Sequence, residues 1–190
     1  GTTQRLWRWI GKIDHLDCRG AAHPGNYTIS QNDLSAETIM TAPPKIIAVL
    51  GGRECDEQTY QLAFDVGRAI AERGAVLLCG GRTGVMEAAC KGAVSAGGLT
   101  IGILPGADKN DANPWVKIAL PTGIGVARNA IIARACDAAI AIGGKYGTLS
   151  EIAYCLQLNK PICGLNSWPE ISDLRQFNSA SAAVAFAFGE

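Results

Sequence analysis

Short apolar runs alternate with longer amphipathic segments along the chain from about residue 45 onward. The apolar runs are KIIAVLGG at 45–52, AVLLCGG at 75–81, LTIGILPG at 99–106, WVKIALP at 115–121, DAAIAIGG at 137–144 and KPICGLN at 160–166. Runs that are apolar throughout are typical of strands that are buried on both faces of a parallel sheet. The sequence therefore predicts a parallel strand in each run.

The segments between these runs have apolar residues at helical spacing. The clearest is 56–74, where Leu62, Val66 and Ile70 fall on one face and Gly74 marks the end. Further helices are expected at 84–98, 125–136 and 148–159, and a last one within 173–189. Strands and helices that alternate in this way, joined by right-handed crossovers, predict an α/β fold. It is a doubly wound, mainly parallel, Rossmann-like sheet with helices on both faces.

Residues 1–44 do not follow this pattern and are interpreted as an appended N-terminal arm and linker. The pair Pro43-Pro44 is a natural boundary before the first strand. Trp7 and Trp9 of the arm are expected to pack on the main domain or on a partner subunit. Residues 45–190 then form a Rossmann-like nucleotide- or phosphate-binding domain.

Composition narrows the choice of partners and compartment. The chain has 17 basic and 17 acidic residues, and this zero net charge gives no reason to expect nucleic acid as a partner. No apolar stretch reaches the roughly 18–20 residues that span a bilayer, so no membrane partner is expected. The seven cysteines include no CxxC pair and are interpreted as reduced thiols of a cytoplasmic protein. His15, Cys18 and His23 match no standard zinc spacing, and no metal site is predicted.

Glycine pairs stand at the ends of the predicted strands. They are Gly51-Gly52, Gly80-Gly81 and Gly143-Gly144, with Gly123 and Gly125 after a fourth strand. Doubly wound sheets bind their ligands beyond the carboxyl ends of the strands. The glycine pairs therefore predict a ligand site at this edge of the sheet.

Two of these turns, CGGRTG at 79–84 and IGGKYG at 142–147, share the order strand, GGxxG, helix. A ligand can approach a glycine backbone closely, and the helix start that follows offers free N–H groups and a positive dipole end. Such a turn suits a phosphate; the alternative is that the glycines only permit tight turns. The predicted binding residues are Gly51, Gly52, Gly80, Gly81, Arg82, Thr83, Gly84, Asn129, Gly143, Gly144, Lys145, Tyr146, Gly147 and Thr148.

Two established nucleotide motifs are not matched. The P-loop motif GxxxxGK[ST] is absent, so a P-loop NTPase is not expected. In GIGVAR at 123–128, Arg128 occupies the position of the third glycine of GxGxxG, so a dinucleotide redox fold is not supported.

Arg128 and Glu151 are the candidate catalytic residues. TLSE at 148–151 fits a capping box, in which Thr148 caps a helix and Glu151 reaches back to its first amide. The alternative is that Glu151 engages the sugar of a ligand, through the hydroxyls or the anomeric carbon. Arg128 is expected in the first turn of a helix, where a cation opposes the dipole, so it is expected to meet an anion or a carboxylate. The alternative is a surface arginine.

The motifs GGRTGVM, PTGIGVARN and GGKYGTLSE, taken together, resemble those of the LONELY GUY and lysine-decarboxylase-like superfamily of Rossmann-like proteins. The resemblance covers about residues 45–165. Within the superfamily, the chain is most similar to the branch of molybdenum cofactor carrier proteins and their bacterial relatives. The resemblance implies a homo-oligomer, dimer or tetramer, and the apolar helix expected at 125–136 suits such an interface.

The resemblance implies two alternative functions. Carrier proteins bind the molybdenum cofactor, a pterin with a phosphate, without turnover, and ARN and GGRxGVM are similar to their motifs. LONELY GUY enzymes are nucleoside 5′-monophosphate phosphoribohydrolases, which hydrolyse the N-glycosidic bond without a cofactor. Their catalytic arginine and glutamate match Arg128 and Glu151, but their signature begins with proline where this chain has Ile142. This difference favours a protein that binds a phosphorylated small molecule, either a nucleotide or the molybdenum cofactor.

Overall fold

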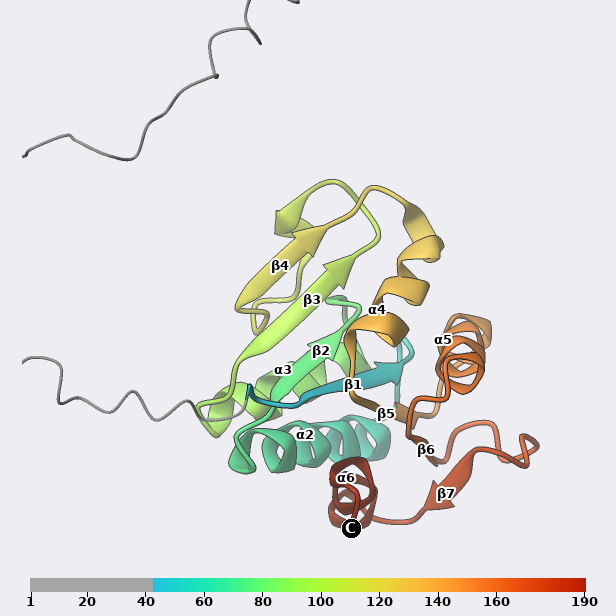
Figure 1. The fold of residues 1–190 in the computed structure, drawn as a ribbon. Helices are drawn as coiled ribbons and strands as arrows, with labels where there is room; N and C mark the ends of the chain where they lie inside the picture. Colours follow the sequence, from blue (N-terminus) through green and yellow to red (C-terminus); the bar gives the residue numbers. More distant parts are fainter. Residues whose placement is uncertain (1–42) are drawn as a thin grey trace, which may run out of the picture. The chain divides into compact units, whose positions relative to one another are not determined.

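The fold is that of a computed structural model, which describes residues 43–190 (Figure 1). The predictions for Trp7, Trp9, His15, Cys18 and His23 lie outside the described residues. The division of the chain at residue 44 therefore stays a prediction.

Seven parallel strands form one sheet in the order β4-β3-β2-β1-β5-β6-β7 (Figure 1). The strands are β1 (Ile46–Gly51), β2 (Val76–Cys79), β3 (Thr100–Leu104), β4 (Ile118–Pro121), β5 (Ala138–Ile142), β6 (Ile162–Leu165) and β7 (Arg175–Phe177). The central strand β1 pairs with both β2 and β5, so that Ala48 lies between Leu78 and Ala139. Its residues 47–50 are buried, as expected of an apolar strand that is covered on both faces.

Helices cover both faces of the sheet, which confirms the predicted doubly wound α/β fold. The α-helices are α2 (Glu57–Glu72), α3 (Val85–Ser95), α4 (Asn129–Ala135), α5 (Tyr146–Gln157) and α6 (Ala180–Phe188). One core joins α2, α3 and α6 to the sheet through Ile47, Val49 and Ile140. The other core joins α4 and α5 to the opposite face through Ala48, Leu50 and Ala139. Neighbouring residues of β1 therefore point to opposite cores, as the two-residue period of a strand requires.

The order of the strands fixes where a ligand could bind. After β1 the chain continues through α2 toward β2, and after β5 it continues through α5 toward β6 on the other side. Since β1 and β5 are neighbours, their connections leave toward opposite faces. A crevice opens between the carboxyl ends of two such strands, at the point where the strand order reverses.

Several elements differ from the predicted ones. The helix expected at 125–136 is divided into a 3₁₀ helix, η3 (Gly125–Arg128), and α4. A second 3₁₀ helix, η2 (Lys109–Asp111), lies in the loop before β4, and β4 begins only at Ile118. The short edge strand β7 was not predicted, because its sequence RQF has no apolar run. None of these differences changes the topology.

Candidate functional site

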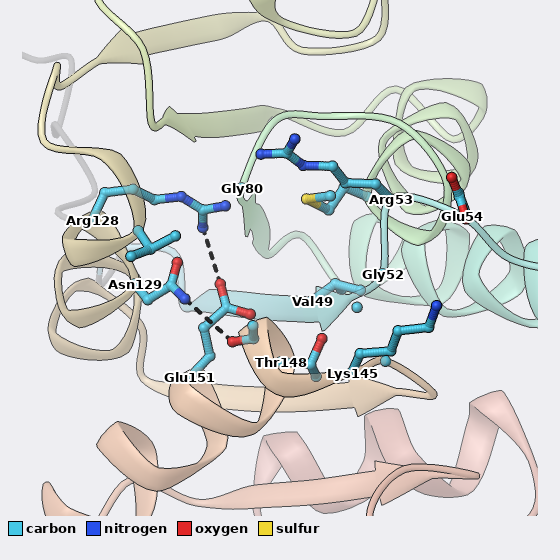
Figure 2. A pocket seen from close by; sticks show the side chains of 15 residues that line it. Val49, Gly52, Arg53, Glu54, Gly80, Arg128, Asn129, Lys145, Thr148 and Glu151 are labelled. Atoms are coloured by element: carbon cyan, nitrogen blue, oxygen red, sulfur yellow. Dashed lines mark hydrogen bonds and ion pairs between the residues drawn. The ribbon is translucent and has the colours of Figure 1, made fainter.

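A cavity of about 400 Å³ lies beyond the carboxyl ends of β1, β2 and β5, at the reversal of the strand order (Figure 2). Its lining residues are Val49, Gly51, Gly52, Arg53, Glu54, Gly80, Met86, Val126, Arg128, Asn129, Gly144, Lys145, Gly147, Thr148 and Glu151. They come from segments that are far apart in the sequence. The parallel topology brings them together, because it places all strand ends at one edge of the sheet.

The N-terminus of α5 forms one wall of the cavity. The turn before it contains two consecutive left-handed glycines, Gly143 at φ +52° and Gly144 at φ +92°. Ser167 donates a hydrogen bond of 2.6 Å to the carbonyl of Gly143, which fixes this turn. No side chain caps the helix, so its first N–H groups have no partner among the described residues. Uncapped N–H groups beside a cavity are suited to an anion.

The conformation of Gly144 matters to the turn itself. A Cβ at this position would lie only 2.5 Å from the Cβ of Thr148, in addition to the strain of its positive φ. Gly147 differs, because it has no positive φ, and a Cβ there would meet nothing within 4 Å. Gly147 is therefore the glycine of this turn at which a methyl group can be added without disturbing the fold.

The capping box predicted for TLSE is wrong. The helix begins at Tyr146 with Lys145 as its N-cap, so Thr148 is the third helical residue and Glu151 the sixth. Thr148 and Glu151 are both buried. The helix starts earlier than predicted: Lys145 is still extended, and helical geometry begins at the next residue, Tyr146. Glu151 consequently points from α5 toward the cavity and η3, instead of back to the helix start (Figure 2).

Arg128 forms a buried ion pair with Glu151. Its Nη1 lies 3.0 Å from Oε1 of Glu151, and only 8% of Arg128 and 6% of Glu151 are exposed. The interpretation of Arg128 as a surface arginine is therefore wrong, and the predicted contact with a carboxylate is present. Arg128 ends η3 and does not lie in a first α-helical turn.

Gly80 has a structural reason to be glycine. The Arg128 guanidinium lies directly on it, and a Cβ at Gly80 would come within 2.7 Å of Nη1. The glycine at the end of β2 therefore makes room for a protein side chain. The ion pair in turn joins η3, α5 and the end of β2 into one wall of the cavity.

The environment of Glu151 changes its ionisation. Burial raises its pKa to about 7, because desolvation penalises the charged form more than the nearby Arg128 favours it. A carboxyl with this pKa exchanges protons near neutral pH. Perturbed carboxyl groups in a cavity are candidates for function, although buried ion pairs of a structural kind are shifted as well.

Asn129 joins α4 to α5 beside the ion pair. Its Nδ2 donates to the carbonyl of Gly147 at 3.2 Å and to Oγ of Ser150 at 2.8 Å. These two bonds use both amide protons and fix the orientation of the side chain. The amide oxygen accepts no hydrogen bond from the described residues, so it is available to a donor in the cavity.

Six of the predicted binding residues do not line the cavity: Gly81, Arg82, Thr83, Gly84, Gly143 and Tyr146. Arg82 pairs with Asp111 at 3.3 Å, and Thr83 donates to the carbonyl of Arg53 at 2.9 Å. Tyr146 is 82% exposed, and the centre of its ring lies 6.1 Å from that of Trp168. The first GGxxG turn is thus used mainly for contacts within the protein, and the second faces the cavity.

Five lining residues were not predicted: Val49, Arg53, Glu54, Met86 and Val126. Arg53 and Glu54 follow Gly52 at the end of β1, and this position was the only signal in the sequence.

In the part of the chain that the structure describes, no three His, Cys, Asp or Glu side chains are placed to hold a metal ion. No helix among residues 43–190 is long and apolar enough to cross a membrane.

The protein has a doubly wound parallel sheet and a cavity where its strand order reverses. These two features define it as a Rossmann-like α/β protein with a crevice at the usual ligand-binding position. More particularly, residues 44–187 match the SLOG cluster4 family, and the chain belongs to that family.

Three similar proteins extend this result. The chain is 46% identical to a protein of Archaeoglobus fulgidus described as uncharacterized, over 74% of this chain and 92% of that protein. It is similar to the solved molybdenum cofactor binding protein of Rippkaea orientalis, with 35% identity and a TM-score of 0.74. The match covers 78% of this chain and 98% of that one. It is also similar to the solved molybdenum cofactor carrier protein of Chlamydomonas reinhardtii, with 34% identity and a TM-score of 0.71. This match covers 78% of this chain and 100% of that one. These similarities confirm the predicted resemblance to the carrier branch.

The raised pKa of Glu151 predicts how stability depends on pH. In the unfolded chain Glu151 ionises near its ordinary value of 4.5, and in the folded protein only near 7. Between these values the folded state binds more protons, so stability falls as pH rises through this window and levels off above about pH 7. The fall should amount to at most about 3.5 kcal/mol, since one pKa unit corresponds to about 1.4 kcal/mol.

Melting temperatures of the wild type and Glu151→Gln, measured from pH 5 to pH 8, test this prediction. The variant lacks the titrating group, so its melting temperature should decline less over this range. Parallel curves for the two proteins would contradict the predicted ionisation of Glu151.

Proposed function

We propose that this protein binds a phosphorylated small molecule in the cavity at the strand ends, as a carrier and without turnover. The observation that carries the proposal is the uncapped N-terminus of α5 at the cavity wall, where the N-cap Lys145 and Gly147 both line the space. The helix N–H groups and dipole favour an anion, and a lysine adds a positive charge. A phosphate group therefore fits this wall better than a neutral group does.

The remainder of the cavity suits the organic part of such a ligand. Val126, which is 81% exposed, offers apolar surface, and Asn129 offers a free amide oxygen. Pockets for cofactors commonly combine apolar walls with a few polar groups that fix orientation. The similar proteins of Rippkaea orientalis and Chlamydomonas reinhardtii bind or carry the molybdenum cofactor, which supports this cofactor as the ligand. A nucleoside monophosphate is the other candidate.

A second candidate function is favoured by the Arg128–Glu151 pair. Hydrolysis of the N-glycosidic bond of a nucleoside 5′-monophosphate develops positive charge on the ribose. A carboxylate beside the anomeric carbon would stabilise this charge and orient the attacking water. Glu151 lines the cavity from α5; burial raises its pKa to about 7, and Arg128 opposes this rise by favouring the ionised form. Neither step needs a metal or another cofactor.

We further propose that the protein is a homo-oligomer, dimer or tetramer, in the cytoplasm. Apolar side chains are exposed on η3, α4 and α5 and in the turn before η3: Val126 at 81%, Ile124 at 50%, Tyr154 at 42% and Ile131 at 39%. An exposed apolar group of this kind is typical of an interface.

The six described cysteines are all free thiols, which supports a reducing compartment.

Ligand binding is tested by titrating the protein with molybdenum cofactor and with nucleoside monophosphates. At least one should bind with a Kd below millimolar. Gly147→Ala places a methyl group in front of the helix N-terminus and should weaken binding at least tenfold, or about 1.4 kcal/mol. Its melting temperature should stay the same or rise, because alanine is favoured over glycine in a helix by about 1 kcal/mol.

Lys145→Gln should weaken binding in the same way, whereas Arg134→Gln, on the exposed part of α4, should not. If no phosphorylated molecule binds below millimolar, or if Gly147→Ala binds as the wild type does, the phosphate does not lie on α5.

The two functions are separated by incubation with adenosine monophosphate. A carrier should leave the nucleotide intact, so no free adenine should appear over hours of incubation with micromolar protein. Release of adenine that disappears in Glu151→Gln would establish the hydrolase instead. Lys145→Gln serves as the comparison, because it weakens binding without removing the carboxyl group.

The oligomer is tested by light scattering at micromolar concentration. The measured mass should be at least twice the 19.9 kDa of one chain. Ile131→Glu should lower it by placing a charge in the apolar face. Leu99→Glu, at a similarly exposed residue before β3, should leave it unchanged. A particle of about 19.9 kDa in the wild type would disprove the proposal.

A further inference from the structure

Arg53 is an exposed cationic residue that lines the cavity. Its backbone is fixed, because its carbonyl accepts a hydrogen bond of 2.9 Å from Thr83 and packs closely on Gly84. Its guanidinium forms neither an ion pair nor a hydrogen bond with any residue of 43–190. Arg68, Arg73, Arg82 and Arg128 each pair with a carboxylate, whereas Arg134 has no such partner among the described residues but does not line the cavity.

The guanidinium of Arg53 lies on the same side of the cavity as that of Arg128. Figure 2 shows Arg53 reaching from the end of β1 toward the side of Gly80, on which the Arg128 guanidinium lies. Arg128 is more than nine-tenths buried, and its Nη1 is used by Glu151. Its Nη2 lies on the side of Gly80 and bonds to no described residue. Two cations that lie on the same side of a cavity with free donors are suited to bind an anionic group.

This location differs from that of the phosphate on α5. Lys145 extends away from Arg128, on the opposite side of the cavity (Figure 2). Glu54 lies on that far side as well and does not come between the two arginines. Although the whole chain has no net charge, three cationic residues and only two carboxylates line this cavity. The positive charge is thus divided between two separate places.

We infer that the ligand of this cavity carries two anionic groups, one on the N-terminus of α5 with Lys145 and one between Arg53 and Arg128. This inference rests on the proposed function, since it takes the first group to be the phosphate on α5. The second group selects among phosphorylated molecules. A phosphate ester with a further anionic centre fills both places, whereas a nucleoside monophosphate leaves the arginine pair empty.

The inference is tested with inorganic phosphate, pyrophosphate and tripolyphosphate as probes, titrated at one fixed ionic strength because exposed charges are screened by salt. Wild type, Arg53→Gln, Lys145→Gln and the control Arg134→Gln are compared. The wild type should bind the best polyphosphate at least tenfold more tightly than phosphate. Arg53→Gln should lose most of this preference while its affinity for phosphate stays within twofold, and Lys145→Gln should weaken every probe.

The possible results separate this inference from the proposal on which it rests. If phosphate binds but Arg53→Gln weakens all probes equally, there is one anion site and not two. If Arg53→Gln weakens none of them, its side chain is only solvated, and the inference is again wrong while the proposed function stands. Failure of all three probes to bind would overturn the inference, whereas the proposed function is decided by the titration with molybdenum cofactor and nucleoside monophosphates. Arg53→Gln should melt as the wild type does, because its side chain has no partner within the described protein.

Discussion

The buried ion pair of Arg128 and Glu151 determines the form of the cavity. Removing two charges from water costs several kcal/mol for each, and a single pairing bond of 3.0 Å recovers only part of this. A core of apolar side chains would stabilise the same place at least as well. The ion pair nevertheless constrains what surrounds it: a side chain at Gly80 would displace the Arg128 guanidinium, and α5 presents Glu151 on its inner side. The free energy lost by burying these charges is explained if the pair contacts a ligand and is not there to stabilise the fold.

The wall opposite the ion pair is built by the second glycine turn. Gly143 and Gly144 turn the chain so sharply that α5 begins at Tyr146 without a side-chain cap. Natural helices usually satisfy their first N–H groups with a serine, threonine or aspartate, and α2 does so with Asp56. In α5 the N-cap is Lys145, whose side chain cannot accept a hydrogen bond. The N-cap position of α5 is therefore occupied by a residue that attracts an anion and does not cap the helix.

The sequence predicted the fold well and the site less well, for a physical reason. Buried strands such as 137–144 have to be apolar on both faces, so their pattern is visible in any single sequence. The position of a site residue depends on tertiary contacts. Both GGxxG turns look alike in sequence, yet Arg82 pairs with Asp111 while Lys145 lines the cavity. Arg53 has no motif of its own and becomes recognisable only when β1, β2 and η3 are brought together. The start of α5 was displaced because TLSE satisfies a local rule that the preceding glycines override.

The two charges of the ion pair also link ligand binding to protons. The pKa of Glu151 is about 7, so at neutral pH two forms of the pair coexist. Both side chains are charged in one form, and Glu151 is neutral in the other. An anionic ligand beside Glu151 would raise the pKa of its carboxyl group further, since like charges disfavour ionisation. Binding would then take up a proton, and protonation of Glu151 would release the Arg128 guanidinium to the ligand. A hydrolase needs this carboxylate ionised while the ligand is bound, whereas a carrier is assisted by its protonation. The protonation state of Glu151 in the liganded protein therefore distinguishes retention of an anion from cleavage of its glycosidic bond.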